Sequence, residues 1–347
     1  MSKPQIKALS ADELRQALVE MGEKPFRAGP ILKWLHTPVV SFDEMTDQSK
    51  ALRARLAERF ELTVPGLVRR QQSKVDGTVK YLWQMREGDL VESVLMRYEH
   101  GNTVCVSTQV GCRMGCKFCA SGLLGLRRNL SAGEILDQVL FAQKDCGQKI
   151  HNIVLMGTGE PLDNYENVLK FLHLVSSPGG IHIGQRHISL STSGLADKIE
   201  KLAAENLQIT LSVSLHAPDN DSRNRIMPVN RSFPIERLMQ ACRYYFDTTG
   251  RRISYEYAMA HGVSDRPWQA ERLAALLRGR PGHVNLIPLN RVKESPLQPS
   301  SREAARRFQQ ILEKNGVTVT VRRRLGPDID AACGQLRRRT LEEGDRK

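Results

Sequence analysis

The sequence has 347 residues, of which 40% are hydrophobic and 26% charged, a composition ordinary for a globular chain with a large core. No apolar run approaches a membrane span, the first residues lack the apolar stretch of a secretion signal, and the cysteines gather mostly in one cluster. We therefore expect a cytoplasmic protein without a membrane partner or a disulfide framework. The formal net charge of +13 favours a polyanionic partner.

Residues 1–62 predict a small helical domain. Ser10 followed by Glu13 is the pattern of a capping box, which marks the beginning of a helix. Apolar residues then recur at helical spacing and predict this helix and two more. These residues are Leu14, Leu18 and Met21 in the first helix, Ile31 to Leu35 in the second, and Leu52, Leu56 and Phe60 in the third.

Residues 63–97 predict a β-meander, because turn signals at Asp76-Gly77 and Glu87-Gly88-Asp89 break a strand-like pattern. From 98 to 325, short apolar strands alternate with helices. Ser131 with Glu134 begins one of these helices, and another ends at Asn315-Gly316. The predicted strands are 104–107, 153–156, 188–191, 209–214, 253–257, 284–288 and 317–321.

Repeated strand–helix units imply a parallel sheet with its helices outside. Six units and a final strand fit a partial barrel better than a complete eightfold one. The predicted fold class is therefore α/β, a partial (β/α)6 barrel over 98–325, with a small N-terminal helical plus β-meander part and a C-terminal segment over 326–347.

Cys112, Cys116 and Cys119 form a C-x3-C-x2-C pattern. Three such thiolates can hold an iron–sulfur cluster but leave one iron of a [4Fe–4S] cluster open for chemistry. Structural zinc usually takes four ligands, often in two separated pairs. A redox pair of Cys116 and Cys119 would leave Cys112 unexplained. The cluster is the favoured interpretation, and zinc or unmetallated thiols are the alternatives.

Polar and glycine-rich residues follow the predicted strands, and active sites of α/β barrels gather at those ends. Each of these segments has a plain alternative: the Gly159-Glu160 segment could be a simple strand-to-helix turn, and His216 a core histidine. Together with the cysteines they form a rim suited to S-adenosylmethionine bound at the open iron. The segments are 157–161, 191–194 and 214–216, with Asn290 after a later strand.

Pairs and triplets of arginine recur along the chain. Any one of them is more simply a solvated face, but their sum favours a nucleic-acid partner. Aromatic residues are only 5% of the chain, so no stacking platform for single strands is evident. The runs are 69–70, 127–128, 251–252, 306–307, 322–324 and 337–339.

Several longer motifs carry a family resemblance that covers nearly the whole chain. They are Cys105-Val106-Ser107-Thr108-Gln109-Val110-Gly111-Cys112, Gly159-Glu160-Pro161-Leu162, Leu190-Ser191-Thr192-Ser193-Gly194, Ser214-Leu215-His216-Ala217-Pro218 and Asp328-Ile329-Asp330-Ala331-Ala332-Cys333-Gly334-Gln335-Leu336. With the cysteine triplet they resemble the radical SAM RNA (adenine-C2)-methyltransferases of the RlmN type.

The resemblance implies a role for each matching residue. Cys112, Cys116 and Cys119 would hold a [4Fe–4S] cluster. Two S-adenosylmethionine molecules would be used per turnover, one to methylate Cys333 on sulfur and one to generate the radical that activates this methyl group. Cys105 would then release the product by forming a transient disulfide with Cys333. The implied S-adenosylmethionine contacts are Gly159, Glu160, Ser191, Ser214, Leu215, His216 and Asn290.

Glu92 is the implied proton acceptor, a role that the sequence pattern alone does not indicate, because Glu92 reads there as a polar residue alternating on a strand. Cys146 and Cys242 lie outside the motifs and are interpreted as small buried hydrophobes.

The substrate implied by the resemblance is adenosine 2503 in the peptidyl-transferase region of 23S rRNA, together with adenosine 37 of some tRNAs. The base would have to leave its stack, with the helical domain 1–62 as a clamp on the RNA. An electron donor such as flavodoxin or ferredoxin is implied as a further partner.

Three alternatives stay open at this point. The first is C8 methylation of the same adenosine, as in an antibiotic-resistance branch of the family. The second is another radical SAM reaction, on a peptide or a small molecule. The third is a non-catalytic RNA-binding module with a structural metal.

Overall fold

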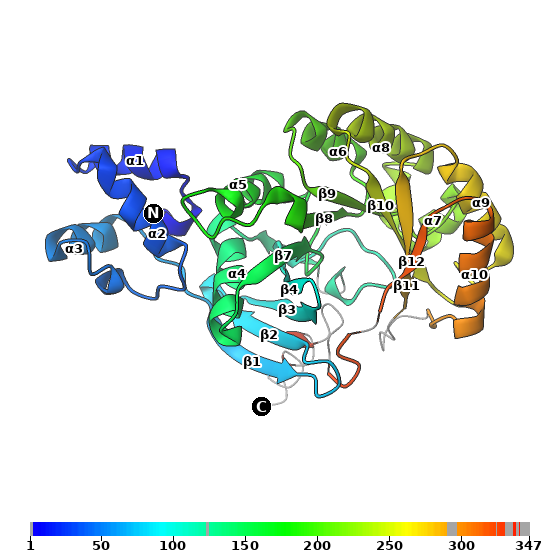
Figure 1. Ribbon diagram of the computed structural model, residues 1–347, viewed down its shortest axis with the longest axis horizontal. Helices are drawn as coiled ribbons and strands as arrows, with labels where there is room; N and C mark the ends of the chain where they lie inside the picture. Colours follow the sequence, from blue (N-terminus) through cyan, green and yellow to red (C-terminus); the bar gives the residue numbers. More distant parts are fainter. Residues whose placement is uncertain are drawn as a thin grey trace.

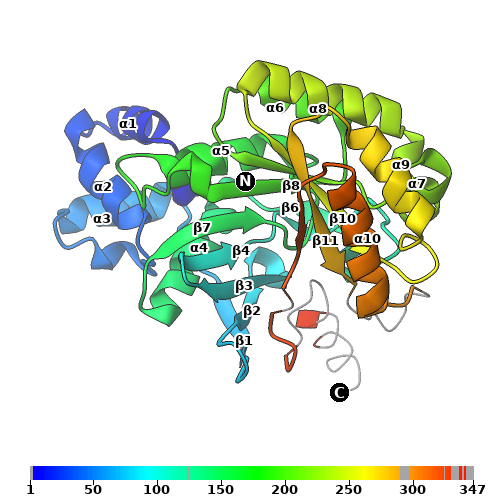
Figure 2. The same cartoon turned by 45° about the vertical axis from the view of Figure 1, so that its right-hand side comes forward.

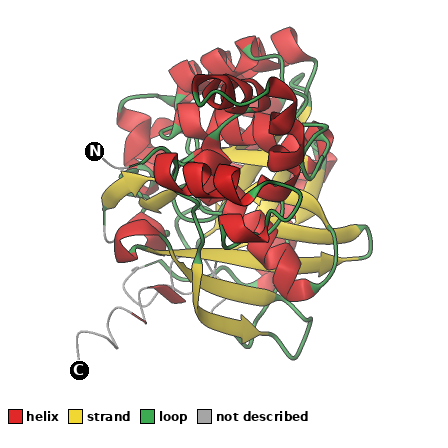
Figure 3. Ribbon diagram, turned by 90° about the vertical axis from the view of Figure 1, so that its left-hand side faces the viewer, coloured by secondary structure: helices red, strands yellow, loops and turns green. Residues whose placement is uncertain are grey.

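The computed structural model describes residues 3–122, 125–289, 297–323, 325–329, 336–337 and 340. Among these residues, no helix is both long enough and apolar enough to cross a membrane. A helical N-terminal part stands beside a large curved sheet, whose helices stack over one side (Figures 1 and 3). The predicted α/β class is therefore confirmed.

The N-terminal part consists of α1 (Ala11–Glu20), α2 (Ala28–Leu35) and α3 (Lys50–Arg59). The predicted capping box begins α1: the Ser10 hydroxyl accepts from the Glu13 amide, and the Glu13 carboxylate accepts from the Ser10 amide. The predicted apolar positions face one another in a separate small core. Burial of this shared apolar face stabilises helices that are too short to persist alone.

The predicted meander consists of β1 (Gly66–Gln72), β2 (Val79–Gln84) and β3 (Leu90–Tyr98), paired antiparallel. It does not form a separate sheet. Strand β3 pairs antiparallel with β4 (Gly101–Cys105), which in turn pairs parallel with β7 (Ile150–Leu155). The meander therefore extends the edge of the barrel sheet.

The ten-stranded sheet runs in the order β1-β2-β3-β4-β7-β8-β9-β10-β11-β12. From β4 onward neighbouring strands are parallel, as the strand–helix alternation predicts. The later strands are β8 (Ile188–Thr192), β9 (Thr210–Ser214), β10 (Ile253–Met259), β11 (Gly282–Pro288) and β12 (Val319–Val321). The helices are α4 (Ala132–Cys146), α5 (Tyr165–Ser176), α6 (Ala196–Ala204), α7 (Asn220–Ile226), α8 (Ile235–Thr249), α9 (Pro267–Leu277) and α10 (Arg302–Lys314).

Several predicted strands differ from the observed bounds: β4 ends at Cys105, where 104–107 was predicted, β7 ends at Leu155 and β12 begins at Val319. The chain leaves the sheet after Cys105: the Ser107 amide donates to the Gln138 side chain at 2.9 Å instead of to a neighbouring strand. A small second sheet was not predicted. It pairs β5 (Gln109–Gly111) with β6 (Leu126–Asn129) and encloses the cysteine segment between its strands.

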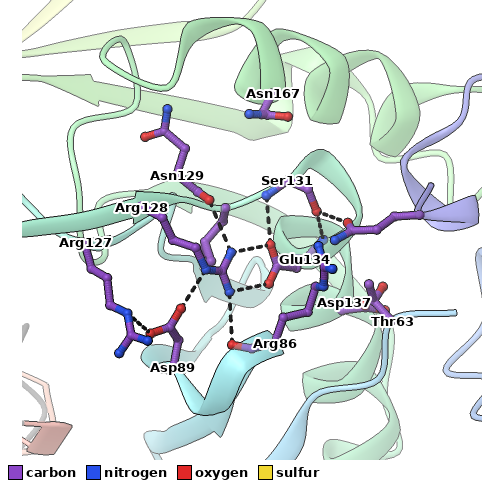
Figure 4. Close-up of polar contacts among 12 residues, drawn as sticks. Thr63, Arg86, Asp89, Arg127, Arg128, Asn129, Ser131, Glu134, Asp137 and Asn167 are labelled. Carbon is purple, nitrogen blue, oxygen red and sulfur yellow. Dashed lines mark hydrogen bonds and ion pairs between the residues drawn. The ribbon is translucent and has the colours of Figure 1, made fainter. Parts of the chain in front are cut away.

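An ion-pair network connects the meander, the second sheet and α4 (Figure 4). Arg128 on β6 donates to Asp89 at 2.6 Å and to both oxygens of Glu134 at 2.9 Å. Arg127 also contacts Asp89, at 2.9 Å. The Asp89 and Glu134 side chains are almost fully buried, so these arginines neutralise internal carboxylates. This basic run is therefore structural.

A buried ion pair attaches the N-terminal part to the barrel. Lys7 donates to Asp137 of α4 at 2.7 Å and to the Thr63 carbonyl at 2.9 Å, and neither charged side chain is more than 1% exposed. The Thr63 hydroxyl donates to the other Asp137 oxygen at 2.5 Å. Since both charges are removed from water, each depends on the other for neutralisation.

Substitution Lys7→Met is expected to lower the free energy of unfolding by about 3–5 kcal/mol, because it leaves a buried carboxylate without its cation. Urea unfolding followed by fluorescence measures the change. Lys170→Met is the matched control, since Lys170 pairs with Glu13 across the same junction with partly exposed side chains. The control should cost about 1 kcal/mol or less. Equal losses in the two variants would contradict this account.

Candidate active site

A cavity of about 350 Å³ lies at the carboxyl ends of the parallel strands. Most residues predicted for the site line it, although they come from five separate segments. Glu92 and Leu215 do not line it, and Asn290 and Cys333 lie outside the described residues. The predicted residues that line the cavity are Cys105, Cys112, Cys116, Cys119, Gly159, Glu160, Ser191, Ser214 and His216.

The cysteine segment is positioned by the small second sheet. Gly111 has a φ of 86°, and an added Cβ would lie 1.8 Å from the Gly125 carbonyl oxygen, so only glycine fits. The Cys112 amide donates to that same oxygen at 3.0 Å. Further along, the Lys117 amide donates to the Ile226 carbonyl at 2.9 Å. These backbone contacts hold the three thiols against the cavity.

The donor chemistry of this segment fits an iron–sulfur cluster. Burial raises the pKa of Cys112 to about 12 and that of Cys116 higher still, so both thiols need a nearby cation to ionise. Iron supplies such charge, since a coordinating thiol is deprotonated. In the described part of the chain, no three His, Cys, Asp or Glu side chains are grouped so as to hold a single metal ion. A cluster spreads its thiolates over separate irons.

Glu160 is buried at the end of the segment that follows β7. Its carboxylate accepts from the Ser193 amide at 2.7 Å and the Leu162 amide at 3.1 Å, and its own amide donates to Gln109. Burial raises the pKa of Glu160, and the hydrogen bond from Ser193 opposes this shift. A carboxylate offers about four acceptor positions, so Glu160 can both fix the strand ends and accept from an ammonium group.

His216 is held in a strained conformation beside the cysteine segment. Its φ of 58° is uncommon for a residue other than glycine. Its Nδ1 accepts from the Ala258 amide at 3.0 Å, and its ring packs edge-on against Phe118. Burial lowers the pKa of His216 to about 3, so the ring is neutral near pH 7. His216 therefore contributes shape and a neutral ring nitrogen, not charge.

Arg223 is a supporting residue that the sequence reasoning missed. It is fully buried on α7 and donates to the carbonyls of Ser193, at 2.6 Å, and of Ser214 and Leu215, at 3.1 Å. Leu215 is thus a buried residue whose backbone is fixed by Arg223. Burial lowers the pKa of Arg223 to about 10, which still leaves it charged at neutral pH. No local pattern distinguishes it from its exposed neighbour Arg225.

Glu92 lies on β3, two residues before Val94, and Val94 pairs with Cys105 of β4. Glu92 is therefore near the end of β4 at which Cys105 lines the cavity. Its side chain is 3% exposed and pairs with fully buried Lys80 at 2.9 Å. The Arg337 amide donates to the other Glu92 oxygen at 2.6 Å. Lys80 was also missed, and the one signal for it is a lysine inside the otherwise uncharged run 78–83.

Cys105 ends β4 and lies in a small apolar cluster with Val94 and Met96. The other five described cysteines, Cys112, Cys116, Cys119, Cys146 and Cys242, are free thiols. Cys242 is buried in the main core, in agreement with its interpretation as a small hydrophobe. Cys146, for which the same was predicted, is only partly buried and packs against this core.

Comparison with known proteins agrees with this geometry. The model of the radical SAM superfamily matches residues 106–274, and that of the ribosomal RNA large subunit methyltransferase N-terminal domain matches residues 5–62. A crystal structure of a radical SAM methyltransferase from Sphaerobacter thermophilus is 45% identical, with a TM-score of 0.92 over 96% of this chain and 98% of the other.

Two curated relatives share about half of their residues with this chain, and both are named probable dual-specificity RNA methyltransferase RlmN. The protein of Lachnoclostridium phytofermentans is 51% identical over 97% of this chain and 95% of its own length. That of Caldanaerobacter subterraneus is 50% identical over 98% of this chain and 99% of its own.

The partial barrel and its cysteine segment define a radical SAM enzyme, a class whose members use a [4Fe–4S] cluster and S-adenosylmethionine. Within that class the chain belongs to the RlmN family of S-adenosylmethionine-dependent RNA methyltransferases.

Substitution Arg223→Met is expected to lower the free energy of unfolding by about 3–5 kcal/mol, because three strand-end carbonyls lose a buried donor. Binding of S-adenosylmethionine, measured by calorimetry, should weaken with it. Arg225→Met, two residues further along α7 and exposed, is the control and should change stability by about 0.5 kcal/mol or less. If Arg223→Met bound S-adenosylmethionine with unaltered affinity, the contacts of Arg223 with the strand-end carbonyls would not shape the site.

Proposed function

We propose that this protein methylates C2 of adenosine 2503 in 23S rRNA and of adenosine 37 in some tRNAs. The names of its relatives support RNA as the substrate, and the net charge of +13 suits a polyanion. The observation that carries the proposal is that Cys105 shares one cavity with all three thiols of the cysteine segment. A thiol in that position is needed for a reaction that passes through a second cysteine.

In this proposal, Cys112, Cys116 and Cys119 are the protein ligands of the cluster. When bound, the cluster and S-adenosylmethionine supply a carbon radical strong enough to remove hydrogen from a methyl group. Flavodoxin or ferredoxin in the cytoplasm is the proposed electron donor. S-adenosylmethionine binds the rim formed by Gly159, Glu160, Ser191, Ser214, Leu215, His216 and Asn290.

Methyl transfer proceeds through Cys333 in this mechanism, with two S-adenosylmethionine molecules consumed in turn. Cys333 first accepts a methyl group on sulfur, and its carbon is then joined to the adenine ring. Glu92 takes the proton from the ring carbon, and the unpaired electron of the adduct would return to the cluster. Cys105 attacks the sulfur of Cys333 as a thiolate, which breaks the sulfur–carbon bond and leaves a disulfide for later reduction. The released carbon takes up a proton, which completes the methyl group of the base.

Contacts of the described residues support these roles. Lys80 and the Arg337 amide fix the direction of the Glu92 carboxylate, as a base requires, although Glu92 is outside the cavity lining. Asp328 is anchored to the meander by Ser73 and by the Lys74 amide, at 2.5 and 2.8 Å. The chain is therefore attached beside the site both before and after Cys333 in the sequence.

Reconstituted protein under anaerobic conditions should convert adenosine in a 23S rRNA fragment and in tRNA to 2-methyladenosine, identified by mass spectrometry. Cys333→Ala should abolish turnover. Cys105→Ala should leave RNA covalently attached to Cys333, because no thiol remains to break the sulfur–carbon bond. Cys146→Ala, a partly buried cysteine outside the cavity, is the control and should retain activity.

Methyl found at C8 would replace this proposal with the alternative position on the same base. Turnover by Cys333→Ala would exclude the two-cysteine mechanism.

A further inference from the structure

The cavity has two chemically different halves. One half carries the cysteine segment and the rim of serines, glutamate and histidine. The other surrounds Cys105 and is apolar, formed by Val94 and Met96 of β3, Met156 after β7 and Leu325. Methionine side chains adapt to flat ligands, so this half suits an unstacked base better than it suits a charged group.

Two arginine side chains lie at the border of this apolar half. Arg322 and Arg323 follow β12 and line the cavity. The Arg322 amide donates to the Leu286 carbonyl at 2.8 Å, which fixes its backbone at the end of β11. Its side chain reaches the Met156 sulfur at 4.0 Å. A guanidinium is thus held beside the apolar wall.

A second hollow continues outward from this point. It shares Pro288, Leu289 and Arg322 with the cavity and runs along α10, which packs beside β11 and β12 (Figures 1 and 2). We call it the arginine groove. Its polar lining residues are Ser300, Ser301, Arg302, Arg306, Gln309 and Arg322, and its described lining contains no acidic residue.

The arginine side chains at the groove have no acidic partner among the described residues. None of Arg302, Arg306, Arg322 and Arg323 makes an ion pair with another described residue. Other basic runs have internal partners: Arg127 and Arg128 neutralise Asp89, and Arg70 pairs with Asp145 at 3.0 Å. A row of arginines without carboxylates is the pattern expected for a phosphate-binding surface.

We propose that the RNA strand next to the target nucleotide lies in the arginine groove. Its phosphates are bound by Arg302, Arg306 and Arg322 of the groove and by Arg323 of the adjoining cavity lining. The target base turns inward at Arg322 and enters the apolar half of the cavity. This inference rests on the proposed function for the choice of RNA. The shared lining at Arg322 is what connects the backbone path to the base pocket, since phosphate contacts position a strand and the pocket selects the base.

Removal of charge tests the groove directly. Two double variants, Arg302→Gln with Arg306→Gln and Arg322→Gln with Arg323→Gln, are titrated with a fluorescent 23S rRNA fragment at increasing KCl concentration. Each double variant should reduce the slope of log affinity against log salt concentration by roughly 1.5, since each phosphate contact contributes about 0.7–0.9 to that slope. Affinity at low salt should fall roughly tenfold or more for each pair.

Matched variants separate groove contacts from general charge. Arg307→Gln removes the residue next to Arg306 on α10, and Arg243→Gln removes an exposed arginine on α8. Both lie outside the groove and should leave the salt slope unchanged. The double variant Arg302→Lys with Arg306→Lys should retain most of the slope, because lysine still offers a phosphate-binding charge. Absorbance of the cluster and circular dichroism check that each variant is folded.

Three outcomes would overturn the proposal. Salt slopes equal to that of the unsubstituted protein would show that RNA does not use the groove. If the double variants bound RNA normally but turned over more slowly when the electron donor is limiting, the groove would be a binding site for an acidic electron-donor protein. A weaker affinity for S-adenosylmethionine in the 322/323 variant would place these arginines at the cofactor carboxylate.

Failure of the proposed function has a different signature. The unsubstituted protein would then produce no 2-methyladenosine, while the groove variants would still show the reduced salt slope, which supports the groove as an RNA site.

Discussion

The arrangement of the site depends on the two-sided pairing of β4. Its last residue, Cys105, lies opposite Val94 of the antiparallel strand β3 and opposite Val154 of the parallel strand β7. Because side chains alternate along a strand, this register places Glu92 on the same face as Cys105 and one pleat away. The chain beyond β4 leads to the cysteine segment. One set of backbone hydrogen bonds therefore brings the Cys105 thiol, the Glu92 carboxylate and the start of the cysteine segment to one edge of the sheet.

Buried charges hold this edge in place. Arg223 joins the ends of β8 and β9 through their carbonyls, and Lys80 holds Glu92. Glu160 receives the amides of neighbouring segments. Each of these groups would be costly without its partner, so the strand ends are constrained to one arrangement before any ligand binds. Preorganisation of this kind allows a ligand to bind without rearrangement of the strand ends.

Much of the fold followed from periodicity, because the strand–helix alternation and the capping boxes at Ser10 and Ser131 are local signals. The residues of the site were harder to predict from the sequence. Its glycines, serines and cysteines stand after strands, where the architecture predicts an active site, and the resemblance supplied Glu92. Lys80 and Arg223 escaped notice because burial and partners far away in the chain make them important. The arginine runs look alike in sequence, yet Arg128 is internal and Arg322 lines a cavity.

The sequence by itself determined the α/β class, the cysteine pattern and the family to which the chain belongs. These depend on residue spacing and on side-chain chemistry, both of which are written along the chain. Only the tertiary structure decided that the meander joins the barrel sheet. It also decided which arginines form ion pairs with buried carboxylates. It further decided that an arginine groove shares part of its lining with the cavity that Cys105 lines. These features depend on strand register and on the burial of charge, since desolvation makes a distant partner as necessary as a neighbouring one.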